Sequence, residues 1–209
     1  MILTHGANSI SRYPIYVEGP TIGGRKYKAV KIGSQIWLAE NLDYKFSGCV
    51  VGASGTSSSE PRGNYYDNDE TTYGLNGNRY GLLYNQVAAK YLNNNSSLLP
   101  SGWRVPSVSD YNILASAVGD VSIVGTKLKS KIGWVDGAGT DYYGFDAVPS
   151  GDYAGSFNSV GTGCSVWTAD ATDSSHGKNV YFMDSSSAMG VGEPRTLHQM
   201  AIRLVKSIT

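Results

Sequence analysis

Apolar side chains recur with helical spacing in two stretches of the chain. The first stretch predicts a helix over 84–94, and its apolar stripe consists of Leu83, Val87, Ala88, Tyr91 and Leu92. The second stretch predicts a helix over 107–118, because Ser107 and Asp110 have the spacing of a capping box and Gly119 follows the last turn.

Short alternating apolar pieces, separated by glycine, indicate β-strands elsewhere. Lys26–Ile32 and Gln35–Ala39 flank a Gly33–Ser34 turn, and this arrangement predicts a hairpin. Later apolar pieces lie at 144–148, 165–168, 180–183 and 200–205. With helices grouped early and strands late, the pattern predicts an α+β fold of two helices, short antiparallel sheets and long ordered loops.

Residues 1–23 show little periodicity and contain two prolines. We therefore expect an extended N-terminal lead-in, or a disordered tail, followed by one domain over 24–209. Ser54–Ser59 is low in complexity and predicts a mobile surface loop. The start lacks the basic and apolar regions of a signal peptide, and no apolar run has the about 18 residues of a membrane span, so we expect neither feature.

The charge of the chain is balanced, with 17 Lys or Arg against 17 Asp or Glu, and no long basic run occurs. A protein that binds nucleic-acid backbones needs a basic patch, so we expect no nucleic-acid partner. Lys127, Lys129 and Lys131 alternate with Leu128 and Ser130, which predicts that the lysines form the solvated side of one element.

No residue pattern points to catalysis or to a cofactor. His5, His176 and His198 have no partner at catalytic or metal-site spacing, and no nucleophile elbow, zinc motif or nucleotide loop occurs. Cys49 and Cys164 lie far apart, so a disulfide and two small buried thiols are both compatible with the sequence. We therefore expect no enzyme, no catalytic residue and no cofactor.

Calcium requires a dense set of oxygen ligands, which Asp67–Glu70 offers. We expect a solvated acidic loop there, with a structural calcium ion as the alternative. Glu193–Arg195 resembles the Glu-Pro-Asn motif of sugar-binding lectins, but the Arg195 cation replaces an oxygen ligand and repels a metal. We therefore expect no metal-binding residue.

Seven segments, taken in chain order, carry a family resemblance. They are 30–42, 80–84, 99–106, 125–130 with 133–134, 139–145 with Pro149, 166–167, and 202–206. Together they resemble the Fibrobacter succinogenes major paralogous domain family, over roughly residues 24–206. The resemblance implies a C-type-lectin-like fold, related to that of formylglycine-generating enzymes. It is specific for the fold and says little about the ligand.

Two departures from the family pattern concern cysteine. Family members commonly have cysteine before the Pro-Ser-Gly-Trp segment and in the last strand, where this chain has Leu99 and Leu204. Replacement of both by apolar residues is compatible with a reducing compartment. Leaderless domains of this kind are similar to phage tail-tip receptor-binding proteins and to the variable proteins of diversity-generating retroelements. That similarity implies a virion or cell-surface location, with the cytoplasm as the alternative.

The aromatic residues form two groups. The family-like segments contain four tryptophans that we expect in the core, namely Trp37, Trp103, Trp134 and Trp167. Other aromatic residues have polar, glycine-rich surroundings, which suit either a contact surface or packing beneath long loops. They are Tyr65, Tyr66, Tyr142, Tyr143 and Tyr153.

Ala169–Gln199 is the recognition surface that we expect. It mixes small polar residues with a few large side chains and lies between two family-like strands, where variable lectin-like proteins place their ligand-facing positions. An ordinary solvated loop is the alternative. The expected ligand-binding residues are Asp170, Asp173, His176, Lys178, Tyr181, Arg195 and His198.

The leading hypothesis is therefore non-catalytic ligand or receptor binding, in adhesion or host recognition. The expected partner is a protein or glycan receptor on a cell surface, and a homo-oligomer is compatible with the sequence. One alternative is a formylglycine-generating-enzyme-like catalyst, which would need a reactive thiol or a metal pocket. Another is a structural virion component that docks through residues 1–23.

Overall fold

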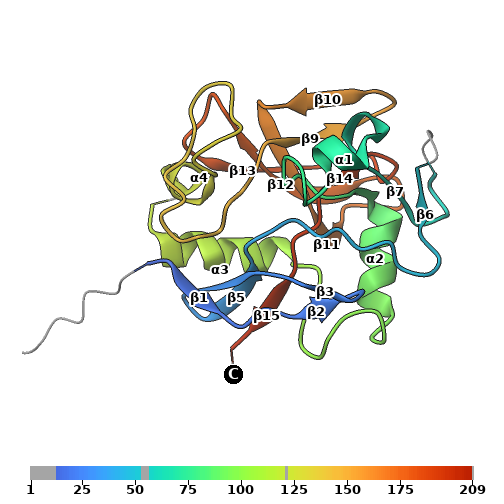
Figure 1. Ribbon diagram of the computed structural model, residues 1–209, viewed down its shortest axis with the longest axis horizontal. Helices are drawn as coiled ribbons and strands as arrows, with labels where there is room; N and C mark the ends of the chain where they lie inside the picture. Colours follow the sequence, from blue (N-terminus) through green and yellow to red (C-terminus); the bar gives the residue numbers. More distant parts are fainter. Residues whose placement is uncertain (1–12, 53–56, 121, 209) are drawn as a thin grey trace, which may run out of the picture.

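The computed structural model describes residues 13–52, 57–120 and 122–208 (Figure 1). Its first sheet has the order β1-β4-β5-β15, with every pair antiparallel. The predicted hairpin is confirmed, and Gly33 turns it with a φ of 59°, where an added Cβ would lie 2.7 Å from Ala117. The strands are β1 (Ile15–Val17), β4 (Ala29–Ile32), β5 (Gln35–Leu38) and β15 (Val205–Ser207).

A second, larger sheet has the order β13-β12-β11-β9-β14-β8-β7-β6, with β10 paired to β9. Its pairs are antiparallel except for β11 with β9 and β6 with β7. The strands are β6 (Val50–Val51), β7 (Arg62–Asn64), β8 (Leu83–Asn85), β9 (Ser150–Tyr153), β10 (Phe157–Val160), β11 (Gly163–Ala171), β12 (Gly177–Met183), β13 (Met189–Gly192) and β14 (Gln199–Met200). A separate ribbon pairs β2 (Thr21–Ile22) with β3 (Arg25–Lys26).

Both predicted helices are confirmed, as α2 (Gln86–Asn94) and α3 (Val108–Val118). The capping box is also confirmed, because the Ser107 hydroxyl accepts the N–H of Asp110 and the Asp110 carboxylate accepts the N–H of Ser107. Helix α3 packs against β4 of the first sheet and against β11 and β12 of the second, so it joins the two sheets. Three helical segments are absent from the sequence prediction: η1 (Tyr66–Asn68), α1 (Glu70–Tyr73) and α4 (Val124–Leu128).

The predicted α+β class is confirmed, although the order of the elements differs from the expectation. Strands both precede and follow the two main helices. Two clusters of buried side chains form the core, one around Trp37 between the first sheet, α3 and β11–β12, and one around Trp167 between α2, β8 and β14. Trp134 is buried as expected, but Trp103 is only partly buried against the second cluster, because it follows a turn closed by its N–H and the Pro100 carbonyl.

The expectation that Lys127, Lys129 and Lys131 form the solvated side of one element is wrong for Lys129. Its side chain is 2% exposed, and its ammonium donates to the carbonyls of Met183 and Ser186, each at 2.9 Å. Burial lowers its pKa from the ordinary value, and the ring of Trp134 lies 5.0 Å from the Nζ atom. The ammonium therefore connects the end of α4 to the turn that follows β12.

Three of the five tyrosines whose role the sequence left open are buried. Tyr65, Tyr143 and Tyr153 are buried, whereas Tyr142 is 51% exposed and Tyr66 is intermediate. These three buried rings therefore belong to the packing of the domain. Of the two interpretations that the sequence allowed, packing applies to these three tyrosines, and a contact surface remains open for Tyr142 and Tyr66.

The described part of the expected lead-in belongs to the first sheet, because β1 pairs with β4 in register Ile15 to Lys31. The earlier part of the lead-in, His5 and part of Ser54–Ser59 lie outside the described residues. In the ranges that the structure describes, no helix has both the length and the apolar character needed to cross a membrane.

Candidate functional site

The long hairpin of β11 and β12 holds most of the expected ligand-binding residues, at and beside its tip. The turn is ordered by Asp173, whose carboxylate accepts the backbone N–H of Ser175 at 2.6 Å and of His176 at 2.8 Å. The same carboxylate lies 3.2 Å from the His176 imidazole. The backbone hydrogen bonds, with smaller help from His176, hold the pKa of Asp173 below its ordinary value. The turn therefore presents His176 from a self-supported backbone.

A second segment, 193–198, runs alongside this tip. Arg195 forms a β-bridge with His176, and the N–H of Thr196 donates to the Ser175 carbonyl at 2.8 Å. The N–H of Gly177 donates to the carbonyl of Pro194 at 3.0 Å. These main-chain bonds bring Arg195 and His176 together, although they lie on different loops.

The two segments and Ser58 enclose a hollow of about 510 Å³. Its lining is almost entirely polar, apart from one leucine. The lining residues are Ser58, Ser174, Ser175, His176, Arg195, Thr196 and Leu197. We call these residues, together with Asp173, Lys178, Glu193 and His198, the hairpin-tip surface.

Charge on the rim of this surface is partly paired. Lys178 lies across from Glu193 with an Nζ–Oε1 distance of 3.7 Å. The N–H of His198 donates to the carbonyl of Arg195 at 3.0 Å. Burial, and then the Arg195 charge, lower the pKa of His198 below its ordinary value of about 6.5, so its imidazole is neutral at neutral pH. The free cation of the surface is thus Arg195, for which the described residues give no ion pair.

Gln86, at the start of α2, fixes the base of the surface. Its side chain is fully buried, its Nε2 atom donates to the Asp170 carbonyl at 2.6 Å, and its backbone N–H donates to the Thr196 carbonyl at 3.0 Å. A Cβ added to Gly177 would lie 2.1 Å from the same Nε2 atom, so only glycine fits there. One helix residue therefore braces both the hairpin and the 193–198 segment.

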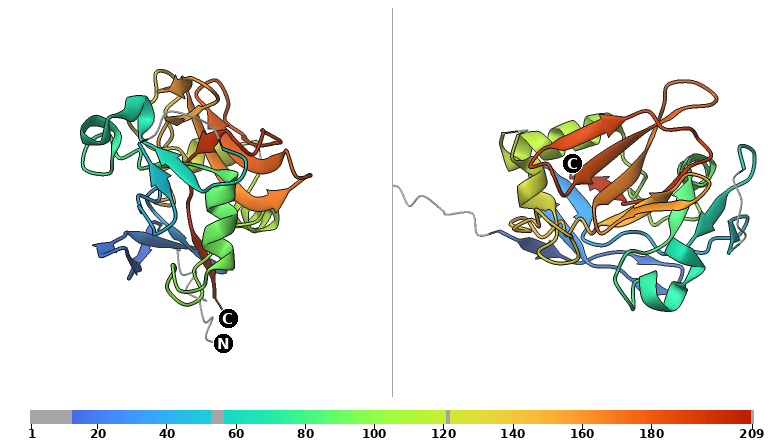
Figure 2. Two further views of the ribbon diagram at one scale, coloured as in Figure 1. Left: turned by 90° about the vertical axis from the view of Figure 1, so that its right-hand side faces the viewer. Right: turned by 90° about the horizontal axis from the view of Figure 1, so that it is seen from above.

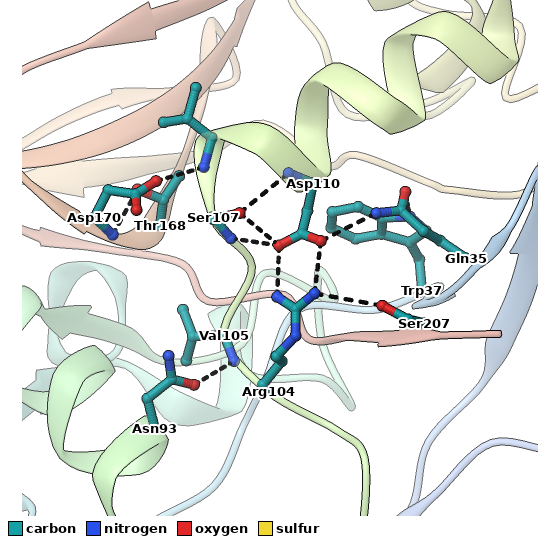
Figure 3. Close-up of polar contacts among 11 residues, drawn as sticks. Gln35, Trp37, Asn93, Arg104, Val105, Ser107, Asp110, Thr168, Asp170 and Ser207 are labelled. Carbon is teal, nitrogen blue, oxygen red and sulfur yellow. Dashed lines mark hydrogen bonds and ion pairs between the residues drawn. The ribbon is translucent and has the colours of Figure 1, made fainter. Parts of the chain in front are cut away.

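Two expected ligand-binding residues lie apart from the others. The Asp170 carboxylate accepts the N–H of Val108 at 2.6 Å, which places it at the first turn of α3 (Figure 3). Tyr181 lies on the opposite face of β12 from Lys178, since successive strand residues alternate. Its ring covers Gly190 of β13, where an added Cβ would lie 2.2 Å from the Tyr181 Cζ atom. The structure thus brings five of the seven residues together.

A polar network around Asp110 holds the segment that Asp170 caps. Arg104 and Asp110 form a two-contact ion pair, with Nη2 and Oδ1 2.7 Å apart, and Gln35 of β5 donates to the same carboxylate at 3.2 Å (Figure 3). Burial acts to raise the pKa of Asp110, but the hydrogen bonds from Arg104 and Ser107 outweigh it and lower the pKa. The network therefore ties the start of α3 to the first sheet.

Sequence reasoning missed the bracing role of Gln86 and five lining residues of the hollow, namely Ser58, Ser174, Ser175, Thr196 and Leu197. Ser58 lies in a low-complexity stretch, and no local pattern relates it to a turn more than one hundred residues later. Gln86 carries no signal either, because its value comes from two carbonyls on distant loops. The other four missed lining residues lie within the stretch 169–199 that the sequence favours.

The groups considered for chemistry or metal binding have other contacts. Asp69 accepts the N–H of Thr72 and begins α1, and Glu70 pairs with Lys45 at 2.6 Å. Both cysteines are free, and burial raises the pKa of Cys49 to about 12 and of Cys164 to about 11. In the part of the chain that the structure describes, no three His, Cys, Asp or Glu residues come together as a metal-binding group.

Comparison with known proteins gives one match. A family model described as the Fibrobacter succinogenes major domain matches residues 30–206. No curated protein and no solved structure matches the chain. The matched range includes α2, α3, the core cluster around Trp37, most of the cluster around Trp167 and the entire hairpin-tip surface. The chain therefore belongs to the Fibrobacter succinogenes major domain family.

Proposed function

We propose that the hairpin-tip surface binds a protein or glycan receptor on a cell surface, without catalysing a reaction. The observation that carries the proposal is the hollow of about 510 Å³, which His176 and Arg195 line from two backbones bonded to each other. Ordering a side chain on binding costs free energy. A surface whose backbone is already fixed avoids part of that cost.

The chemistry of the surface suits a polar ligand. The serine hydroxyls can each donate and accept a hydrogen bond, and the Arg195 guanidinium offers a planar fork of donors to carboxylate or hydroxyl oxygens. His198 is neutral because of its lowered pKa, so it adds a donor and an acceptor without a second positive charge. Leu197 provides an apolar contact within this polar set. Sugar hydroxyls and the polar loops of a receptor protein both offer matching groups.

We also propose that the fold is C-type-lectin-like, as the family resemblance implies, and that the protein works on a virion or cell surface. Two main helices, mostly antiparallel sheets and long ordered loops support this fold. The alternative of a thiol-based catalyst is disfavoured, because the raised pKa values of Cys49 and Cys164 keep both thiols protonated at neutral pH.

The test replaces His176 and Arg195 with alanine in one variant. Labelled protein is applied to a glycan array and to bacterial cells, and we expect the variant to lose about tenfold or more in binding. The melting temperature should change by no more than about 2 °C, because the exposed His176–Asp173 pair contributes little to stability.

Lys31→Ala is the matched control, since it also removes an exposed cation, on β4 outside this surface. It should bind as the unchanged protein does. Unaltered binding by the double variant would overturn the proposed surface. If the unchanged protein bound neither glycans nor cells, the binding proposal would fall, and the alternative that the protein is a structural virion component would take its place.

A further inference from the structure

A second hollow region lies on another part of the molecule, between the β2–β3 ribbon and the loop that follows α4. It consists of two adjoining hollows of about 230 and 360 Å³ that share Lys28, Ala39, Arg79 and Asp146 as lining. None of the hairpin-tip residues lines either one. In the left view of Figure 2 the blue N-terminal strands lie apart from the orange β11–β12 hairpin. We call this region the cationic cleft.

Positive charge exceeds negative charge in this cleft. The first hollow is lined by Arg25, Lys26, Lys28, Arg79 and Arg203 against the carboxylates of Glu40 and Asp146, and the second adds Lys131 against Asp141. Arg79 pairs with Asp146 at 2.5 Å, Lys26 pairs with Glu18 at 2.6 Å, and Arg25 lies 3.6 Å from Glu40. Lys28 is exposed and forms no side-chain hydrogen bond or ion pair with the described residues. The cleft therefore keeps uncompensated positive charge.

Arg203 lies at the floor of the cleft and is 0% exposed. Its guanidinium donates to the Phe145 carbonyl, to Asn41 Oδ1 at 2.7 Å and to the Asp146 carbonyl at 3.1 Å. All three acceptors are neutral, and the attraction of the nearby Asp146 and Asp141 carboxylates offsets only part of the cost of burial, which lowers the pKa of Arg203. A buried charge that is only partly compensated is costly, and an anion in the cleft would lower that cost.

Three buried polar atoms in the cleft have no hydrogen-bond partner among the described protein atoms. They are the Nε atoms of Arg25 and Arg203 and the Oε2 atom of Glu40. Buried polar groups are nearly always bonded, so three in one hollow indicate a place where an outside molecule completes the bonding. The two nitrogen atoms need acceptors, and the carboxylate oxygen, which lies 3.6 Å from Arg25 Nη2 without a hydrogen bond, can accept from a donor.

From this donor and acceptor pattern we infer that the cationic cleft binds an acidic sugar, a ligand that combines a carboxylate with hydroxyl groups. The carboxylate accepts from the arginines and is attracted by Lys28 at the rim. A sugar hydroxyl donates to the Glu40 carboxylate, which acetate, an anion without a hydrogen-bond donor, cannot do. The excess of positive charge favours such a sugar over a neutral one.

Titration calorimetry with sodium glucuronate tests the inference, with glucose, acetate and inorganic phosphate as comparison ligands. We expect glucuronate to bind about tenfold or more tightly than each of the three. Added salt should weaken its binding, because the charges at the rim are exposed. Lys28→Ala should reduce the affinity about three- to tenfold, and Lys28→Glu should abolish measurable binding.

Lys31→Ala is again the control, because it removes an exposed lysine from β4, outside the cleft lining. It should bind glucuronate normally, as should the His176→Ala, Arg195→Ala double variant, so this test is independent of the hairpin-tip proposal. Glucuronate that binds no better than glucose would overturn the inference and indicate that water alone completes the bonding. Acetate or phosphate binding as tightly as glucuronate would overturn the assignment to a sugar, and so would normal binding by Lys28→Glu.

Discussion

At the scale of single residues, Asp141 shows how folding changes the chemistry of an acid. Burial, together with the nearby charge of Asp146, raises the pKa of Asp141 to about 6. The backbone N–H of Asp146 donates to Asp141 Oδ1 at 2.7 Å and acts in the opposite direction. Because the pKa is raised, the folded protein binds this proton more tightly than the unfolded chain does.

Asp141→Asn is therefore expected to stabilise the protein at neutral pH. Stability of the unchanged protein falls as the pH rises from about 4 to about 6, while the carboxyl loses its proton in a buried place. Asparagine keeps the oxygen that accepts from Asp146, and it tolerates the φ of 44° at this position. The expected gain is about 1–2 kcal/mol above pH 7 and close to zero below about pH 4.

Urea unfolding across this pH range measures the difference between the two proteins. A gain of equal size at all pH values would show that Asp141 does not titrate as burial requires. A loss of stability at neutral pH would show that its negative charge is useful where it lies.

Residue-scale predictions from the sequence succeed where the apolar character of a side chain decides its place. Trp37, Trp134 and Trp167 are buried, and Leu99 and Leu204 lie in the same core cluster. They fail where a polar head group finds partners that are distant in sequence. Lys129 is the clearest case, because the carbonyls that bind its ammonium follow it by more than fifty residues.

At the scale of elements, local signals decide which helices the sequence reveals. Helix α3 is predictable because its capping box lies within four residues of its own start. Helix α4 has only five residues and no side-chain cap, so no local signal distinguishes it from a loop. It is held instead by tertiary contacts, among them the N–H of Thr126 on the Ser187 carbonyl and the Lys129 ammonium.

Lys129→Met should for this reason destabilise the protein, by about 1–3 kcal/mol. Methionine fills a similar volume but leaves the Met183 and Ser186 carbonyls without their donor. Lys131→Met is the matched control, since Lys131 is exposed and should lose less than about 0.5 kcal/mol. Chemical denaturation of both variants checks the difference. Equal stabilities would show that α4 does not depend on the buried ammonium.

At the scale of the whole molecule, the fold is closed by strands from opposite ends of the sequence. β15 pairs with β5, and the Arg104 backbone exchanges two hydrogen bonds with Val205. The hairpin-tip surface is assembled in the same manner, from Ser58, the β11–β12 turn and 193–198. The sequence could single out the stretch 169–199, but not the nearness of Ser58. The loop around Ser58 is held by the Asn85 side chain, whose amide donates to the carbonyls of Ser57 and Glu60, and no local pattern signals these contacts.

A chain ended at Leu204 should consequently fail to reach the native state. It lacks β15, which leaves the backbone of β5 unpaired on one side and removes Val205 from the core around Trp37. A chain ended at Ile208 keeps the strand and serves as the control. Far-ultraviolet circular dichroism and a thermal melt compare them, and a cooperative melt of the shorter chain near the temperature of the control would contradict the expectation.

The pairing of β5 with β15 also has a consequence during biosynthesis. β5 leaves the ribosome early and then remains without its neighbour until the last strand has been translated. Throughout that interval an open strand edge beside Trp37 is available to other nascent chains. Efficient production of this protein in cells should therefore depend on chaperones that shield the growing polypeptide, and slower translation should lengthen the period of exposure.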